Sequence, residues 1–353
     1  MNCSNYTVQL RKDIICHIVL FCFAAVGNVG MLLIIYRNLC IKHTLRVFIL
    51  LLHMNIADLI VTFEYLPKQI LHSITKYWYG GIVLCKITRF FDIFGVSLSS
   101  AVLVCMCVDR WLSVSRPFSV FNGIERNKIM LFFAWSTAFL ISLPQVGIFT
   151  VASHPCNEKL TQCVARDYVG LLDSRYVLAY TIATALYIYF LPLCVIVCCY
   201  CRIHYTFKTL NYSGESSLYN NSRINLAKSY TLKLRKAKMK IIRMTWSIVT
   251  FFLLCWTPYY AAATLHFIDT GRSQKNIVIP SIIVKILYMF ATTNSSFNAY
   301  VYGYFTFNIK SELQSLPTFL STKFAFRRRK VEKELIRRKR LIVKDTYCMS
   351  RLK

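Results

Sequence analysis

The stretch that decides the fold is CKITRFFDIFGVSLSSAVLVCMCVDRW, residues 85–111. It is mostly apolar, begins with Cys85 and ends with Asp109-Arg110-Trp111. As a helix, the run from Cys85 to Asp109 is about 36 Å long at about 1.5 Å per residue, which is enough to cross a bilayer. A cysteine that can form a disulfide belongs outside the cell, and an arginine at the other end belongs inside. The stretch therefore predicts a membrane helix with a defined direction.

The whole chain has the composition of a membrane protein. Of its 353 residues, 56% are hydrophobic and only 16% are charged, whereas a soluble domain carries about 25% charge. Apolar runs of membrane-spanning length recur, at residues 14–36, 47–71, 82–114, 127–151, 176–205, 240–268 and 277–305. We therefore predict an all-α membrane protein with a seven-transmembrane helix bundle at 14–305. An extracellular N-terminus at 1–13 precedes it, and a cytoplasmic segment at 306–353 follows, with a short amphipathic helix at 307–316.

The net charge of +28 could indicate nucleic-acid binding, but the charges are distributed as in a membrane protein. If Cys85 is outside, the cytoplasmic segments hold 31 of the 43 lysines and arginines. The positive-inside rule explains this excess, so no nucleic acid is expected as a partner. The basic clusters at 327–330 and 337–340 either attract anionic membrane lipids or form a solvated tail, and both interpretations stay open.

The N-terminus carries signals of its own. No cleavable signal peptide is expected, because the apolar run at 14–36 is too long for one. Asn2 and Asn5 begin glycosylation sequons, which are usable only on the extracellular side. The charge distribution and the sequons together predict a multi-pass plasma-membrane protein with an extracellular N-terminus and a cytoplasmic C-terminus.

A few polar residues interrupt the apolar spans, where lipid makes them costly. The notable ones are Asp58, Ser99, Asn294 and Asn298. We predict that they converge on one hydrated pocket that holds a sodium ion; a purely structural hydrogen-bond network needs the same residues, so both interpretations stay open. No other cofactor is expected. The cysteines lack metal-ligand spacing, and no nucleophile converges with a base, so the chain is predicted not to be an enzyme.

Motifs in all seven predicted spans match one family in order. They are Gly27-Asn28, Asn55-Ile56-Ala57-Asp58, Trp78-Tyr79-Gly80-Gly81, Asp109-Arg110-Trp111, Trp135, Pro192 with Tyr200, Cys255-Trp256-Thr257-Pro258 and Asn298-Ala299-Tyr300-Val301-Tyr302. The chain resembles the rhodopsin-type (class A) G-protein-coupled receptors over residues 27–316. Residues 237–245 and 255–260 resemble the gonadotropin-releasing hormone, adipokinetic hormone and vasopressin/oxytocin receptor group. Residues 56–63, 98–105 and 302–305 look like its invertebrate members.

The resemblance implies signalling through a heterotrimeric G protein, with Gq and calcium expected. Ligand binding would favour a state in which helix six swings out at Pro258. The residues implied in coupling and activation are Asp109, Arg110, Trp111, Tyr200, Trp256, Pro258, Asn298 and Tyr302. Three positions depart from the family: Trp111 stands where tyrosine is usual, Ala299 replaces a proline, and Lys238 occupies a position that is often acidic. Because Arg110 then has no acidic partner on helix six, we predict raised basal activity.

The resemblance also implies a disulfide between Cys85 and Cys163, which pins the second extracellular loop to helix three. A second bridge, Cys3–Cys156, is a hypothesis. The implied ligand-binding residues are Gln69, Arg89, Asp92, Tyr187, Tyr259, Tyr260, His266 and Tyr288. Aromatic walls with sparse polar groups suit an amidated peptide end, although each aromatic can equally be helix packing. An N-terminus of about thirteen residues cannot fold into a hormone-capturing domain, which favours a short peptide hormone.

Asp92 leaves the ligand open, because an acid is unusual there in the relatives. It could bind the ammonium of a biogenic amine, pair with Arg89 on the same helix face, or meet a basic or amide group of a peptide. Against an amine, Thr184 and Ile188 stand where catecholamine sites place hydroxyls. A seven-helix channel or transporter would need broken helix pairs or a continuous polar path, and the sequence offers neither.

Overall fold

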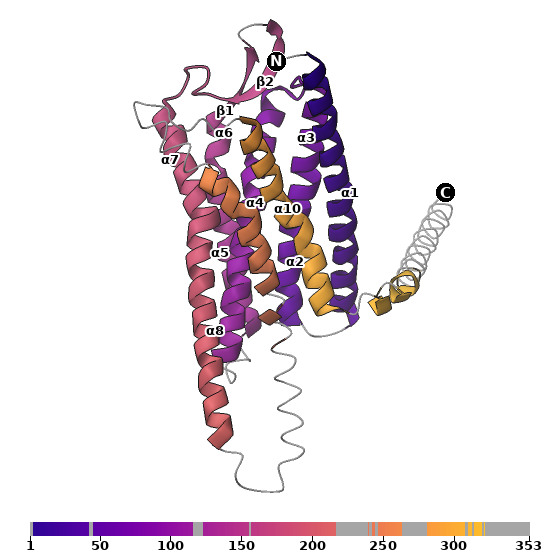
Figure 1. The fold of residues 1–353 in the computed structure, drawn as a ribbon, viewed down its shortest axis with the longest axis vertical. Coiled ribbons are helices and arrows are strands. Elements are labelled where there is room, and N and C mark those ends of the chain that lie inside the picture. The colour runs from indigo at the N-terminus through magenta and orange to yellow at the C-terminus, as the bar shows by residue number, and fades with distance from the viewer. Residues whose placement is uncertain are drawn as a thin grey trace, which may run out of the picture.

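The computed structural model describes residues 3–41, 45–115, 123–154, 157–216, 239, 242–243, 246–262, 281–307, 310–312, 314–319 and 321. Over this part of the chain it is a bundle of long helices that run roughly along one axis (Figure 1). Several predictions fall outside the described residues: those on Asn2, Cys156, Lys238, His266 and the two basic clusters of the tail.

Most of the predicted spans are present as helices. The elements are α1 (Cys3–Ile41), α2 (Leu45–Ile60), η1 (Val61–Tyr65), α3 (Leu66–Thr75), α4 (Gly81–Ser115), α5 (Gly123–Ser142), α6 (Pro144–Ile148), α7 (Ser174–Ala185), η3 (Leu186–Phe190), α8 (Leu191–Ser216), helical residues 246–262 and α10 (Ser281–Thr306). In the described residues, five helical segments are long and apolar enough to cross a membrane: Ile14–Ile41, Arg46–Thr75, Gly81–Ser115, Gly123–Ile148 and Ser174–Thr206.

Several predicted spans are shorter than their helices: the first helix reaches Ile41, the second span reaches Thr75, and the fifth runs on to Ser216. Two other boundaries differ in the kind of structure. The fourth span was expected to reach residue 151, but its helix ends at Ile148 and the chain continues as β1 (Phe149–His154). This strand pairs antiparallel with β2 (Asn157–Ala165), with Val151 opposite Cys163. At the N-terminus, α1 begins at Cys3, so the expected boundary at residue 13 lies inside one helix; its apolar part does begin at Ile14.

Two spans contain a π-helical turn next to a proline. The turn η1 precedes Pro67 in the second span, and η3 precedes Pro192 in the fifth. Proline cannot donate the backbone hydrogen bond that an α-helix needs, and a wider turn accommodates the missing bond. Each π turn also changes the angular position of every residue after it, so a constant 3.6-residue repeat no longer predicts which face a residue occupies.

The short helical segments after α10 are bound to the first span. Glu312 forms an ion pair with Arg37 and accepts a hydrogen bond from Asn38 Nδ2 at 3.1 Å. The Tyr36 and Phe319 rings are in edge-to-face contact, 6.4 Å apart. The predicted helix at 307–316 is confirmed at residues 310–312 and 314–316, whereas Phe307 lies in a bend.

Gly27 lets the seventh span approach the first. A Cβ at Gly27 would lie 2.6 Å from the ring of Tyr300, whereas a Cβ at Gly30 would meet nothing within 4 Å. The Tyr300 ring cannot simply turn away, because it stacks on Phe23 at 4.4 Å and its hydroxyl donates to the Phe23 carbonyl at 2.8 Å.

Gly27→Ala is therefore expected to destabilise the protein by about 1–3 kcal/mol, the usual cost of overpacking. Gly30→Ala is the matched control and should be neutral or slightly stabilising, because alanine favours a helix. Thermal unfolding of the detergent-solubilised protein measures both. Equal melting temperatures for the two variants would contradict the packing argument.

Candidate functional site

A disulfide fixes a β-hairpin over one end of the bundle. Cys85, at the start of α4, is bonded to Cys163 of β2, with 5.7 Å between the two Cα atoms. This confirms the predicted pair. The loop between α3 and α4 contacts the same strand: Trp78 and Thr161 exchange hydrogen bonds of 2.9 and 3.0 Å. The hairpin is thus tied to α4 and to the loop that joins α3 to α4.

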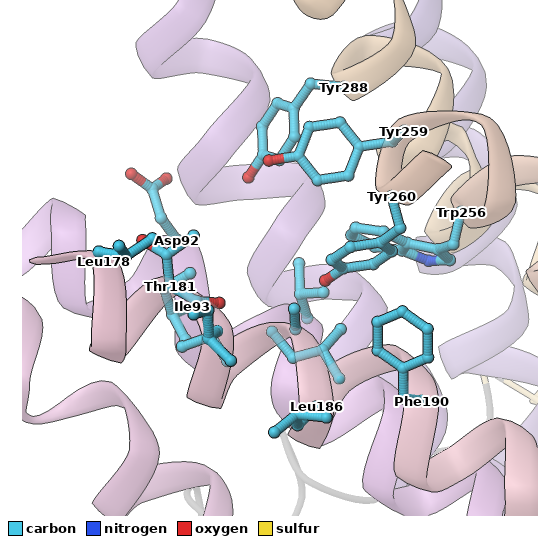
Figure 2. Close-up of a pocket in the computed structure, with 15 residues that line it drawn as sticks. Asp92, Ile93, Leu178, Thr181, Leu186, Phe190, Trp256, Tyr259, Tyr260 and Tyr288 are labelled. Atoms are coloured by element: carbon cyan, nitrogen blue, oxygen red, sulfur yellow. The ribbon is translucent and has the colours of Figure 1, made fainter. Parts of the chain in front are cut away.

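Beneath the hairpin lie two adjoining cavities. The inner cavity holds about 500 Å³, and its walls are mainly apolar and aromatic, with Trp256 and Tyr260 at one end and Asp92 at the other (Figure 2). The outer cavity holds about 570 Å³ and is more polar, with His72, Arg89 and Gln145 in its walls. The residues shared by both are Asp92, Ile93, Thr181, Thr184, Tyr259 and Tyr288. Cavities of this size and lining are typical of small-ligand sites.

The predicted ligand residues divide between these cavities. Gln69 and Arg89 line the outer one, Tyr260 lines the inner one, and Asp92, Tyr259 and Tyr288 line both.

Tyr187 is the exception. It lines neither cavity, and its hydroxyl lies 2.6 Å from the Thr137 hydroxyl of α5. It belongs to η3 and packs, partly buried, against the hydrophobic core. The structure therefore does not bring Tyr187 to the cavity walls with the other predicted ligand residues.

A series of aromatic contacts joins the outer cavity to Trp256. Tyr65 packs edge-to-face on Tyr288, with ring centres 5.6 Å apart, and Tyr288 contacts Tyr259 at 5.2 Å. Tyr259 contacts Tyr260 at 5.2 Å, and Tyr260 stacks on Trp256 at 5.7 Å. Any ligand that moves one of these rings acts directly on the next, since packed interiors have few voids to absorb a displacement.

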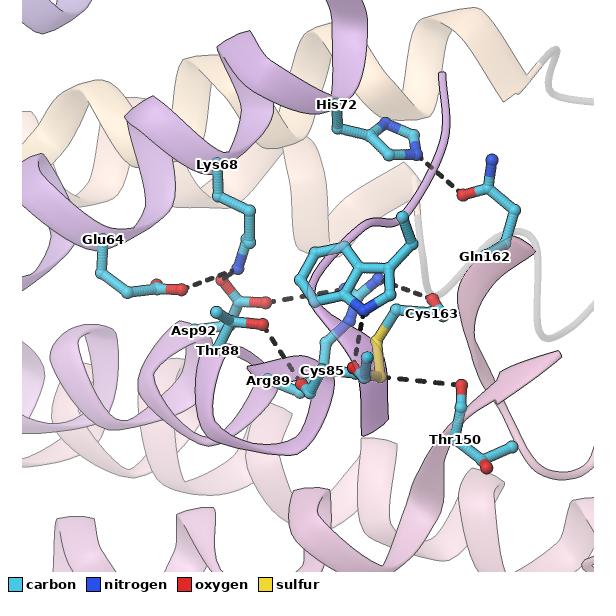
Figure 3. The surroundings of a disulfide bond; sticks show 12 residues. Glu64, Lys68, His72, Cys85, Thr88, Arg89, Asp92, Thr150, Gln162 and Cys163 are labelled. Atoms are coloured by element: carbon cyan, nitrogen blue, oxygen red, sulfur yellow. Dashed lines mark hydrogen bonds and ion pairs between the residues drawn. A yellow bond between two sulfur atoms is a disulfide. The ribbon is translucent and has the colours of Figure 1, made fainter. Parts of the chain in front are cut away.

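Asp92 is paired with two cations of the protein. Its Oδ2 lies 3.6 Å from Arg89 Nη1, as the shared helix face predicted, and its Oδ1 forms an ion pair with Lys68 of α3 (Figure 3). Arg89 also donates to the Cys163 carbonyl at 3.2 Å and lies over the Phe149 ring at 4.5 Å. The sequence did not predict a role for Lys68. The π turn η1 precedes Lys68, so the helical repeat does not predict which side of the helix carries this residue.

The polar residues predicted in the spans do converge. Asp58 is fully buried, and its Oδ1 accepts hydrogen bonds from Ser99 and Asn298, both at 3.3 Å. Among the described residues, Asp58 Oδ2 and Asn298 Oδ1 are buried without a hydrogen-bond partner, and so is Asn294 Oδ1 one turn earlier on α10. One carboxylate and two amide oxygens are a donor set that fits a hard cation.

At the opposite end of the bundle, Asp109 binds arginines from three segments. Its Oδ1 accepts from Arg46 Nε at 2.8 Å and Nη2 at 2.6 Å, and from Arg126 at 3.4 Å. Arg110 lies 3.3 Å from the other oxygen. No local spacing connects Arg46 to Asp109, 63 positions away, so the sequence alone did not predict this contact.

This end of the bundle is closed. Val114 of α4, Ile203 of α8 and Ile242 form a buried cluster, and Trp111 packs against it. Tyr200 packs on Trp246, with ring centres 4.1 Å apart. Arg110 is only 5% exposed. A partner that binds Arg110 must therefore separate these helices first.

Tyr302 is also fully buried, and its hydroxyl accepts a 3.0 Å hydrogen bond from Asn55. Asn55 also donates to Asn28 at 3.1 Å, which links the first, second and seventh spans.

Comparison with known proteins identifies the family. The model of the 7 transmembrane receptor (rhodopsin family) matches residues 27–302. The chain belongs to this family. It is therefore a seven-transmembrane receptor of the plasma membrane and not an enzyme, a channel or a transporter.

Several relatives show which receptors within the family the chain resembles. The chain is 28% identical to a gonadotropin-releasing hormone II receptor of Clarias gariepinus over 88% of its own length and 79% of the relative's. It is 25% identical to a gonadotropin-releasing hormone receptor of Bos mutus grunniens and 26% identical to one of Cavia porcellus, in both cases over 75% of its own length and 78% of the relative's. The expected resemblance to this receptor group is confirmed; an invertebrate origin stays a prediction.

The arginines around Asp109 bear on basal signalling by this receptor. Because Arg46 occupies Asp109 Oδ1, Arg110 shares its only described acidic partner with two other arginines. Arg46→Leu should strengthen the Asp109–Arg110 pair and lower basal activity by up to about tenfold, since a hydrogen bond to a charged group contributes about 1.5–3 kcal/mol.

The matched control is Arg126→Leu, which removes a longer contact to the same oxygen and should have a smaller effect. Ligand-free nucleotide exchange on the coupled G protein, normalised to surface expression, measures both variants. Higher basal activity in Arg46→Leu would overturn the argument.

Proposed function

We propose that the chain is a receptor for a short peptide hormone and that it signals through a heterotrimeric G protein, with Gq and calcium release expected. The relatives named above are receptors for gonadotropin-releasing hormone, a peptide. In this proposal the N-terminus is extracellular, with glycans on Asn2 and Asn5, and the cytoplasmic tail meets G protein and anionic lipid.

The observation that carries the peptide proposal is the pairing of Asp92. An amine receptor needs a carboxylate that is open to the ligand ammonium. Here both oxygens of Asp92 already face cations of the protein, Lys68 and Arg89. The adjoining cavities hold about 500 and 570 Å³, volumes of the order seen in ligand sites. Their tyrosines suit an amidated peptide end.

The arrangement suggests how binding reaches the G protein. A peptide end in the inner cavity contacts Tyr259 and Tyr260, and the aromatic series passes the displacement to Trp256. Helix six then moves at Pro258, which separates Ile242 from Val114 and exposes Arg110. A sodium ion bound at Asp58 would favour the inactive state by joining the third and seventh spans.

A calcium-flux screen of amidated neuropeptides on transfected cells tests the proposal. At least one peptide is expected to act at submicromolar concentration, and biogenic amines are expected to be inactive. Cells expressing Arg110→Ala are the control, because that variant should bind the same peptide without a calcium response. A response to biogenic amines alone would overturn the peptide proposal.

A further inference from the structure

Lys68 lies at the centre of a buried group of charges between the second and third spans. Its ammonium forms an ion pair with Asp92, bonds to Glu64 Oε1 at 3.0 Å, and lies 5.6 Å from the centre of the Tyr65 ring. Figure 3 shows it between the two carboxylates. The side chains are 12%, 9% and 18% exposed for Lys68, Asp92 and Glu64, so little water reaches the group.

The close packing of two helices allows Lys68 to contact Asp92. A Cβ at Gly95 would lie 2.9 Å from Val61 Cγ2, so the absent side chain lets α4 approach the π turn η1 closely. Asp92 lies one helical turn before Gly95 on α4. Glu64 and Lys68 are four residues apart, a spacing that pairs side chains on a helix. The close approach of the two spans therefore places the Lys68 ammonium at Asp92.

The contacts in this group pair its cations with its acids. Asp92 contacts both Lys68 and Arg89, and Lys68 also bonds to Glu64. A cationic ligand that bound Asp92 would displace Lys68 and leave a buried ammonium with a single carboxylate partner. Breaking a buried ion pair is costly because it leaves a charge without compensation. An uncharged ligand group carries no such penalty and can still hydrogen-bond at the edge of the pair.

We infer that Lys68 is a specificity-determining residue: it serves as the built-in counter-ion of Asp92, so the cavity accepts an uncharged ligand group there and rejects a cation. The inference rests on the proposed function and sharpens it, since it selects a peptide end whose charge is blocked, by an amide or an acyl group, over a free ammonium or a basic side chain. It also explains how an acid at this position is compatible with a receptor that is not an amine receptor.

A pair of small probes tests the inference on the wild-type receptor. Tyramine and N-acetyltyramine share one aromatic ring, but only tyramine is a cation. Ligand-induced thermal stabilisation of the purified receptor gives the concentration needed for half of the maximal effect. We expect N-acetyltyramine to stabilise the wild-type receptor at a lower concentration than tyramine. A wild-type receptor that binds tyramine equally well or better overturns the inference.

Lys68→Met removes the counter-ion and keeps the aliphatic stem. It is expected to reverse the order of the probes and to improve tyramine binding by about tenfold, because Asp92 gains a free oxygen for a charged donor. Lys68→Met with Asp92→Asn should lose that gain, and Lys68→Arg should retain the wild-type order. Lys68→Gln provides the same test if the methionine variant fails to reach the surface.

A folded Lys68→Met receptor without any gain for tyramine would refute the inference. The probe measurements are independent of the peptide screen. If no peptide acts but N-acetyltyramine binds more tightly than tyramine, only the proposed function fails. If a peptide acts but tyramine binds as well as N-acetyltyramine, only the inference about Lys68 fails.

Discussion

Replacing Cys163 with serine is expected to weaken peptide binding by about 30- to 1,000-fold. A disulfide typically contributes about 2–4 kcal/mol, and about 1.4 kcal/mol corresponds to a factor of ten in affinity. The loss falls on binding because the Cys163 carbonyl accepts a hydrogen bond from Arg89, which also pairs with Asp92. Without the bond, the hairpin and the charged wall of the cavity both lose their fixed positions. Competition binding with the peptide found in the calcium screen measures the effect.

The double variant Cys85→Ser/Cys163→Ser is the first control and should bind no worse than either single variant, because all three lack the same bond. Cys105→Ser is the second, since Cys105 lies elsewhere on α4 and its thiol donates to the Met130 carbonyl at 3.7 Å. It should bind nearly as wild type. Wild-type affinity in the single variants would show that the hairpin holds its place without the disulfide.

Asp58→Asn is expected to abolish the sodium dependence of agonist affinity. In the wild-type receptor, replacing choline with sodium should lower agonist affinity by about fivefold or more, the usual range of coupling between two sites. The variant keeps a similar shape beside Ser99 and Asn298 but removes the negative charge that holds the cation. Agonist competition curves in the two salts at equal ionic strength measure the difference.

Ser97→Ala is the matched control for this prediction. Ser97 is buried on α4, the helix that carries Ser99, and its hydroxyl has no hydrogen-bond partner among the described residues. Its removal should leave the sodium response intact. A sodium response that survives in Asp58→Asn would reduce the polar cluster to a structural hydrogen-bond network.

Much of the architecture could be predicted because lipid imposes strict conditions on sequence. A helix that crosses a bilayer needs about 20 apolar residues, so the spans are visible as runs. A carboxylate among them must find polar partners, so Asp58 with Ser99 and Asn298 could be expected to meet. The end of the fourth span could not be placed this way, because Phe149 and Val151 extend the apolar run into a strand.

The residues whose positions the sequence did not predict fall into two groups. Lys68 follows the π turn η1, and Tyr187 lies within the π turn η3. The 3.6-residue repeat fails at such turns, so the side of the helix on which these residues lie depends on backbone hydrogen bonds that composition does not encode. Arg46 reaches Asp109 across the interface of two helices. Such a contact depends on how closely the helices pack, and therefore on small residues elsewhere in the chain.

The attachment of Glu312 to Arg37 and Asn38 has a practical consequence for studies of motion. The segments after the seventh span are fastened to the first span, so they should follow the first span when the seventh moves. A spin label or fluorophore placed on residues 314–319 would then serve as a fixed reference point. Distances from it to labels on helix six would report the outward swing alone, whereas a label on α10 would mix two movements.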